Sequence, residues 1–372
     1  RNAFILYEAI HIASMVVGAF SPNMDFLIAC RFVMGVGLGA LLVTLFAGFT
    51  EYMPGRNRGT WSSRVSFIGN WSYPLCSLIA MGLTPLISAE WNWRVQLLIP
   101  AILSLIATAL AWRYFPESPR WLESRGRYQE AEKVMRSIEE GVIRQTGKPL
   151  PPVVIADDGK APQAVPYSAL LTGVLLKRVI LGSCVLIAMN VVQYTLINWL
   201  PTIFMTQGIN LKDSIVLNTM SMFGAPFGIF IAMLVMDKIP RKTMGVGLLI
   251  LIAVLGYIYS LQTSMLLITL IGFFLITFVY MYVCYASAVY VPEIWPTEAK
   301  LRGSGLANAV GRISGIAAPY AVAVLLSSYG VTGVFILLGA VSIVVAIAIA
   351  TIGIETKGVS VESLSIDAVA NK

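Results

Sequence analysis

The chain has 372 residues, of which 57% are hydrophobic and only 12% are charged, and its mean hydropathy is +0.79. This composition is too apolar for a water-soluble protein of that length, so it predicts a polytopic membrane protein. The net charge of +7 does not indicate a nucleic-acid partner, because the basic residues lie in short loops between apolar runs.

Ten apolar runs are each long enough to cross about 30 Å of hydrocarbon as a helix. In chain order they cover roughly residues 3–20, 26–49, 62–87, 93–114, 179–206, 213–236, 243–261, 264–290, 304–327 and 331–353. If Arg1 is cytoplasmic, all of the 26 basic residues except Arg31, Arg94 and Lys212 fall on or near that side. We therefore expect both ends of the chain in the cytoplasm.

The segment Pro116–Leu122 separates four apolar runs from the six that follow it. Its two prolines end a helix, and its Arg and Trp suit a membrane–water boundary. We expect an incomplete N-terminal bundle at 1–115, a cytoplasmic linker at 116–177, a C-terminal bundle at 178–353 and a tail at 354–372. Within the linker, residues 127–140 have the apolar spacing of an amphipathic helix, and the proline-rich stretch 146–166 is predicted to be flexible.

Two motifs recur about 240 residues apart. The pattern Glu, Pro, Arg-Gly occurs in Glu51–Gly59 and again in Glu293–Gly303, while Pro116–Ser118 corresponds to Ile354–Thr356. Features in the same order at nearly one offset predict duplicated halves. The segment Asp237–Lys242 would then have its counterpart just before residue 2, so we expect twelve spans in the complete protein, with the first two missing here.

Together these motifs resemble the major facilitator superfamily, in its sugar-porter and organic-ion-transporter branch. The likeness includes Arg31–Gly39 and Glu355–Gly358 and covers nearly the whole chain. It implies an all-α membrane protein that works as a monomer by alternating access, similar to bacterial inner-membrane metabolite transporters. The chain departs from the family pattern at Met233 and Pro240, where glycines are usual, and at Ile354, where proline is usual.

The resemblance also implies a cytoplasmic gate, in which ion pairs bias the balance between two conformations. An alternative is that these residues are solvated charges at helix ends, each contributing little. The gate candidates are Glu51, Arg58, Glu117, Arg120, Asp237, Arg241, Glu293, Arg302 and Glu355.

Polar and aromatic residues near the middle of several spans are candidates for substrate binding. Asn190, Gln193 and Tyr194 share one stripe of a helix. The set suits a small polar ligand with a flat or apolar body, although hydrogen bonding between helices is the alternative role. Its other members are Asn70, Trp71, Tyr280 and Tyr285.

Arg312 is the candidate for charge selection, because it lies about eight residues into a span and intramembrane arginines usually face a polar pathway. Its place resembles one where organic-anion transporters carry Arg and organic-cation transporters carry Asp, which implies an anionic ligand. Pairing with a helix carbonyl or a neighbouring acid is the alternative.

Three further residues are candidates for proton coupling. Glu8 and His11 are three residues apart and share a helix face, and His11 is the only histidine of the chain. The resemblance makes this run a partly peripheral third span, which favours a satisfied structural pair. Arg31 corresponds to an Arg that pairs with an acid of the first span in proton-coupled relatives, and a helix anchor is its alternative role.

The sequence contains no phosphate loop, no metal-ligand spacing and no catalytic constellation, so we expect neither an enzyme nor a cofactor nor a metal. The predicted function is secondary transport of a small organic acid in symport with protons. The alternatives are a passive facilitator or proton-antiport exporter of a sugar-like or aromatic compound and, less favoured, a transporter-like nutrient receptor.

Overall fold

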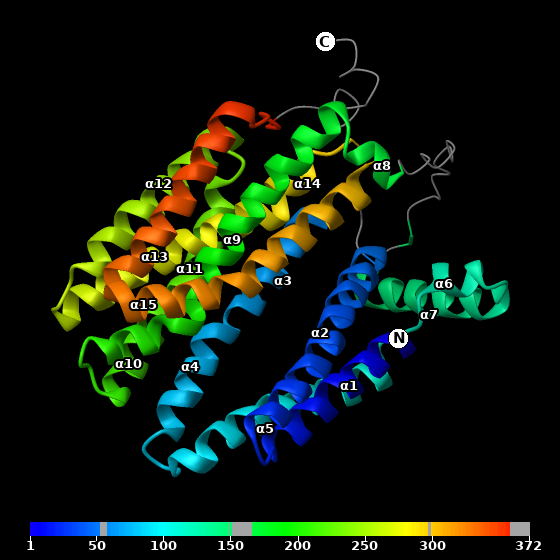
Figure 1. The fold of residues 1–372 in the computed structure, drawn as a ribbon. Coiled ribbons are helices and arrows are strands. Elements are labelled where there is room, and N and C mark those ends of the chain that lie inside the picture. Colours follow the sequence, from blue (N-terminus) through cyan, green and yellow to red (C-terminus); the bar gives the residue numbers. More distant parts are fainter. Residues whose placement is uncertain (53–57, 148, 151–165, 297–298, 358–372) are drawn as a thin grey trace. The chain divides into compact units, whose positions relative to one another are not determined.

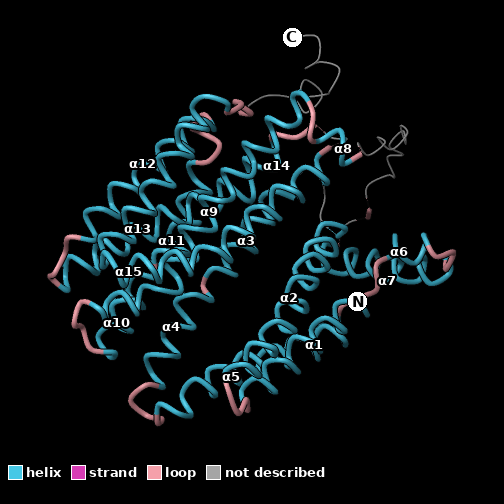
Figure 2. The backbone as a smooth tube through the Cα atoms, viewed as in Figure 1, coloured by secondary structure: helices cyan, strands magenta, loops and turns pink. Residues whose placement is uncertain are grey.

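The computed structural model describes residues 1–52, 58–147, 149–150, 166–296 and 299–357. Throughout this part of the chain the regular elements are helices (Figures 1 and 2). Eight helical segments within it are long and apolar enough to cross a membrane. All ten predicted runs fall largely in helices. One long helix contains two of them, while the runs at 62–87, 213–236 and 264–290 are each divided between two consecutive helices.

The chain divides into two compact units. Unit 1 comprises Arg1–Ser62 and Gly82–Asp158, and unit 2 comprises Ser63–Met81 and Gly159–Lys372. Sequence order assigns the run at 62–87 to the first bundle, whereas most of this run belongs to unit 2. The predicted bundle boundaries themselves remain a prediction.

Unit 1 is built on α1 (Asn2–Ala19), α2 (Met24–Tyr52) and α5 (Ala89–Tyr114), with α1 packed against the other two. Gly37 of α2 permits this packing, since a Cβ there would lie 3.1 Å from both the His11 nitrogen and the Tyr7 carbonyl oxygen. The short α6 (Pro119–Ser124) begins where the Ser118 side chain accepts a hydrogen bond from the Trp121 N–H at 3.1 Å.

The amphipathic helix α7 (Tyr128–Thr146) contains the predicted segment 127–140 except for Arg127, which precedes its first residue. It ends at Gly147, whose φ of 64° lies in the left-handed region that glycine adopts at helix ends. Ala131 is its one side chain described as buried.

The segment that links the units contains α3 (Arg58–Asn70) and α4 (Ser72–Leu83). Its residues in unit 2 contact helices of the second half through aromatic rings. The Phe67 and Phe230 ring centroids are 6.1 Å apart, and those of Tyr73 and Tyr280 are 5.1 Å apart. These contacts explain why residues 63–81 belong to unit 2.

The remaining helices of unit 2 follow one another closely along the chain. They are α8 (Tyr167–Leu170), α9 (Gly173–Thr206), α10 (Leu211–Met222), α11 (Gly224–Val235), α12 (Arg241–Ser260), α13 (Met265–Cys284), the π-helix η2 (Tyr285–Tyr290), α14 (Val291–Glu293) and α15 (Lys300–Ile352). Gly330 interrupts α15 with a φ of 65°, which divides it into the two spans expected from sequence.

Close helix packing in unit 2 depends on glycine. The most extensive helix contact is between α9 and α15, followed by α12 with α15 and α11 with α13. On α11, a Cβ at Gly224 would lie 2.9 Å from the Thr277 nitrogen, and one at Gly228 would overlap the Thr277 carbonyl oxygen. Small residues four apart therefore bring the backbones of α11 and α13 into contact, as in many membrane proteins.

Candidate functional site

A polar and aromatic cluster lies in unit 2, on α4, α9, α13 and α15. We call it the Arg312 cluster; it consists of Tyr73, Asn190, Gln193, Tyr194, Tyr280 and Arg312. All but Tyr73 are predicted from sequence, and the structure brings them together from four helices.

Arg312 of α15 is held by a hydrogen bond to α9. Its Nη1 donates to the Tyr194 hydroxyl oxygen at 2.5 Å. Arg312 is exposed on unit 2 while Tyr194 is half-buried, and none of the described acidic side chains forms an ion pair with Arg312. A guanidinium has five N–H donors, so most of its donor capacity is available to another partner.

Asn190 is almost completely buried beside this pair, with 2% of its surface exposed. Its Nδ2 donates to the Leu186 carbonyl at 2.7 Å, whereas its buried Oδ1 has no hydrogen-bond partner in the described part of the chain. An unsatisfied buried acceptor costs about 1–3 kcal/mol, so this oxygen is a polar group whose hydrogen bond is not supplied by the described residues.

Two glycines of α15, on either side of Arg312, bring α9 close. A Cβ at Gly311 would lie 3.0 Å from the Asn190 Nδ2, and one at Gly315 would lie 3.2 Å from the Tyr194 ring. Their small size therefore sets Asn190 and Tyr194 beside Arg312. Sequence reasoning missed this role, although glycines four residues apart on a span are a recognisable signal.

Tyr280 connects the cluster to α4. Its ring meets that of Tyr73 edge-on at an interplanar angle of 64°. The Tyr280 hydroxyl is buried and forms no hydrogen bond of standard geometry with described residues, although Tyr73, Gln193 and Tyr194 lie within electrostatic range of it. The cluster thus combines aromatic surface with unpaired polar groups, as ligand sites do.

The other predicted substrate residues lie elsewhere in unit 2. The Asn70 Nδ2 donates to the Ser66 carbonyl at 2.7 Å, and Trp71 packs edge-on against Phe67 and Phe223. Tyr285 is fully buried, and its hydroxyl is so close to α12 that a Cβ at Gly245 would overlap it. The structure therefore places Tyr285 in helix packing rather than in the Arg312 cluster.

Four of the predicted gate residues and one threonine form a second cluster in unit 2. We call it the clasp; it consists of Asp237, Arg241, Glu293, Glu355 and Thr356. The Arg241 guanidinium is buried and bonds both Glu293 oxygens, with Nε to Oε2 at 3.1 Å and Nη2 to Oε1 at 3.2 Å. Arg241 Nη2 is also 3.2 Å from Asp237, and Thr356 Oγ1 donates to Glu293 at 2.6 Å.

Glu355 caps α12 within the clasp. Its carboxylate accepts the backbone N–H groups of Arg241 at 2.8 Å and Lys242 at 3.1 Å, at the positive end of the helix. Partial burial alone would raise the pKa of Glu355, but hydrogen bonds from the N–H groups of Arg241, Lys242 and Lys357 outweigh it and hold that pKa below its ordinary value. The carboxylate is therefore stabilised in its charged form.

Tyr290 of η2 fixes the chain that leads into the clasp. Its hydroxyl accepts the Ile354 N–H at 3.0 Å and donates to the Ile354 carbonyl at 3.1 Å. Its ring stacks on Tyr285, with centroids 5.0 Å apart and planes 15° apart. Tyr290 therefore positions the neighbouring Glu355 and Thr356.

The remaining gate candidates have diverse surroundings. Glu117 lies 2.8 Å from the amino group of Arg1 in unit 1, and the Arg302 guanidinium lies over the Tyr167 ring at 5.2 Å in unit 2. The side chains of Glu51, Arg58 and Arg120 lie outside the described part of the structure.

Two of the proton-coupling candidates form a pair in unit 1. His11 Nδ1 is 3.4 Å from Glu8 Oε2, and both side chains are largely enclosed. This contact agrees with the shared face predicted from their spacing. Arg31 is exposed on α2 of the same unit.

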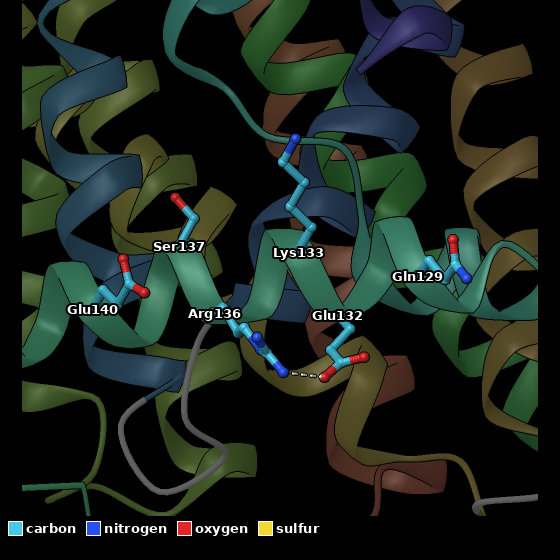
Figure 3. A pocket seen from close by; sticks show the side chains of 6 residues that line it. All are labelled: Gln129, Glu132, Lys133, Arg136, Ser137 and Glu140. Carbon is cyan, nitrogen blue, oxygen red and sulfur yellow. Dashed lines mark hydrogen bonds and ion pairs between the residues drawn. The ribbon is translucent and has the colours of Figure 1, made fainter.

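A surface hollow on α7 does not resemble a substrate site. Figure 3 shows its lining, which consists of Gln129, Glu132, Lys133, Arg136, Ser137 and Glu140, all from one helix. Arg136 and Glu132 form an exposed ion pair at 2.7 Å. Binding pockets usually have apolar walls from several elements, which this hollow lacks.

The eight long apolar helical segments define a multispan membrane protein. The sequence model of the Major Facilitator Superfamily matches residues 3–319, so the chain belongs to that superfamily. It is 44% identical to the inner membrane metabolite transport protein YdjE of Escherichia coli, over 98% of this chain and 80% of the relative. It is 26% identical to the niacin transporter NiaP of Acinetobacter baylyi, over 94% of this chain and 77% of that protein.

Solved structures show the same fold. The partially occluded inward-open xylose transporter XylE from E. coli matches with a TM-score of 0.72 at 18% identity, over 97% of this chain and 82% of that one. These findings confirm the predicted all-α fold of the superfamily. They also confirm that the chain is a multi-pass metabolite transporter and not an enzyme.

Proposed function

We propose that the protein carries a small organic anion together with protons across the bacterial inner membrane, with both ends of this chain in the cytoplasm. The observation that supports an anion is Arg312, a cation within a span that bonds Tyr194 and has no acidic partner among the described residues. An uncompensated charge in a span is costly, and an anionic ligand would offset that cost.

The neighbours of Arg312 favour an organic body on the anion. The partly exposed Tyr73 ring, packed edge-on against Tyr280, provides an aromatic surface, and the buried Asn190 Oδ1 could accept a hydrogen bond in a conformation that opens it to the ligand. An aromatic carboxylate combines these features. The relative named as a niacin transporter carries such a molecule, since niacin is a pyridine carboxylate.

The clasp supports alternating access. Its ion pairs join the start of α12 to Asp237 and to the end of α14, and hydrogen bonds of Glu355 and Thr356 add the segment after α15, so these contacts can bias one arrangement of the elements. We propose that the clasp lies at the cytoplasmic mouth and holds the inward gate closed in one state.

An uncharged, sugar-like substrate is the second candidate. The amides of Asn190 and Gln193 and the tyrosine rings are groups that also bind sugars, and one relative is named an arabinose-proton symporter. A sugar, however, leaves the Arg312 charge uncompensated. The two candidates therefore differ in whether transport needs a negative charge on the substrate.

The test is uptake by proteoliposomes containing the full-length protein. The panel comprises labelled aromatic and aliphatic carboxylates, their uncharged amides and several sugars, each tested with and without an inward pH gradient. We expect saturable uptake of a carboxylate that depends on the gradient. Liposomes without protein are the control, because weak acids cross bilayers in their neutral form. Uptake of sugars but not of carboxylates would refute the anion proposal, and gradient-independent uptake would refute symport.

A further inference from the structure

The Glu8–His11 pair lies well inside a membrane-spanning helix. Glu8 is about 9 Å along α1 from its first residue, at a rise of about 1.5 Å per residue. For the whole Glu8 residue the exposed fraction is 7%. For the side chains alone it is 9% for Glu8 and 14% for His11. Two titratable groups are thus enclosed together where charge is costly.

Glu8 lies well within its helix. The other acidic residues of the described spanning helices lie at the ends of those helices or just beyond them. Those acids are Asp25, Glu51, Glu90, Asp213, Asp237 and Glu293. His11 is the only histidine of the whole sequence. The pair is therefore the most interior combination of an acid and a base among the described spans.

We propose that Glu8 and His11 together bind the transported proton, an inference that rests on the proposed symport. With one proton the pair has no net charge, whether the proton is on the imidazole or on the carboxylate. Loss of that proton leaves a net charge of −1 on the pair, inside a spanning helix where charge is costly. The pair holds the proton while enclosed and exchanges it when water reaches the site.

The described side chains of the neighbouring helices α2 and α5 supply no hydrogen-bond or ion-pair partner to the Glu8–His11 pair. Gly37 of α2 contacts the His11 backbone, and Cys30 of α2 faces Gly18 rather than the pair. The Arg94 guanidinium of α5 donates to the Ser21 carbonyl at 3.4 Å, beyond the far end of α1. None of the described titratable groups of α2 and α5 bonds to the pair; these are Asp25, Cys30, Arg31, Glu90, Arg94, Arg113 and Tyr114.

The experiment uses Glu8→Gln and His11→Gln in the full-length protein, reconstituted with a pH dye inside the liposomes. The probe is a labelled pyridine carboxylate, or whichever carboxylate the wild-type protein transports. One proton moved down a gradient of one pH unit supports about tenfold accumulation of a monovalent anion. Each variant should lower this ratio to about one, while exchange of labelled for unlabelled substrate continues. Ser14→Ala on the same helix is the matched control and should accumulate substrate like the wild-type protein.

The outcomes separate this inference from the proposed function. If the wild-type protein moves no protons with any substrate, proton symport itself is wrong. If it moves protons and both glutamine variants keep the same proton-to-substrate ratio in their remaining activity, the pair is structural and the inference is wrong. If Glu8→Gln does not fold, Glu8→Asp retains an acid, and a shifted pH dependence of its proton flux supports the inference. An unchanged pH dependence contradicts it.

Discussion

Replacing Gly228 with Ala should push α11 and α13 apart. The new methyl group would overlap the Thr277 carbonyl oxygen and approach the Thr277 Cα to within 3.2 Å. These are backbone atoms, so no side-chain rotation relieves the overlap and the helices must separate. Overpacking of this kind costs about 1–3 kcal/mol, and the higher helix propensity of Ala offsets up to about 1 kcal/mol. We expect Gly228→Ala to lower the free energy of unfolding by about 1–2 kcal/mol.

The matched control is Gly247→Ala on α12, where an added Cβ would have no neighbouring heavy atom within 4 Å. It should leave stability unchanged or raise it slightly, because only the helix propensity changes. Unfolding of both variants and of the wild-type protein is followed in detergent with increasing dodecyl sulfate. If Gly228→Ala unfolds at the same concentration as Gly247→Ala, then the described contact between α11 and α13 does not stabilise the protein.

Three further predictions concern the clasp and its surroundings. Because the pKa of Glu355 is lower in the folded state than the ordinary value of about 4.3, its contribution to stability is present above that pH and is lost as the pH falls through the folded-state pKa. Glu355→Gln should therefore flatten the acid side of the thermal-stability profile, and an unchanged profile would contradict the capping role. Tyr290→Phe removes both hydrogen bonds to Ile354 and should accelerate hydrogen exchange at the Ile354 amide, with a loss of about 1–3 kcal/mol; equal exchange rates would show that the contact is absent. Gly303→Ala would force a methyl group into the buried Trp295 ring and should cost about 1–3 kcal/mol, seen as a lower thermal midpoint; an unchanged midpoint would contradict this packing.

Hydrophobicity predicts the spans well, but some predicted spans are shorter than the helices that contain them. The fifth run is predicted to begin at residue 179, whereas α9 begins at Gly173. Lys177 and Arg178 lie in this extra length, where hydropathy falls although the helix continues. Lys177 is exposed and can extend toward water, whereas Arg178 is buried with 2% of its surface exposed. Both residues lower the local hydropathy, so the predicted run begins later than the helix.

The candidate site could be predicted in part because the positions of polar residues along α9 and α15 are visible in the sequence. The spacing of Asn190, Gln193 and Tyr194 correctly indicates one shared face, and Arg312 lies beside it. Tyr73 was missed because spacing within one helix does not show which distant helix it contacts.

Tyr285, by contrast, is predicted from sequence as a substrate residue, but the structure places it in helix packing. It lies in η2, a π-helix that changes the direction of the side chains relative to an α-helix. Pro292, which follows η2, indicates from sequence that the helix is irregular there. The sequence does not show that the Tyr285 ring lies against Gly245.

The central claim of an anion site at Arg312 is tested most directly by comparing a carboxylate substrate with its uncharged amide. Initial uptake of both is measured for the wild-type protein, Arg312→Lys and Arg312→Gln. A hydrogen bond to a charged group contributes about 1.5–3 kcal/mol, so the wild-type preference for the carboxylate should fall by roughly 10- to 150-fold in Arg312→Gln. Arg312→Lys should keep part of the preference. An equal preference in all three proteins would contradict the account.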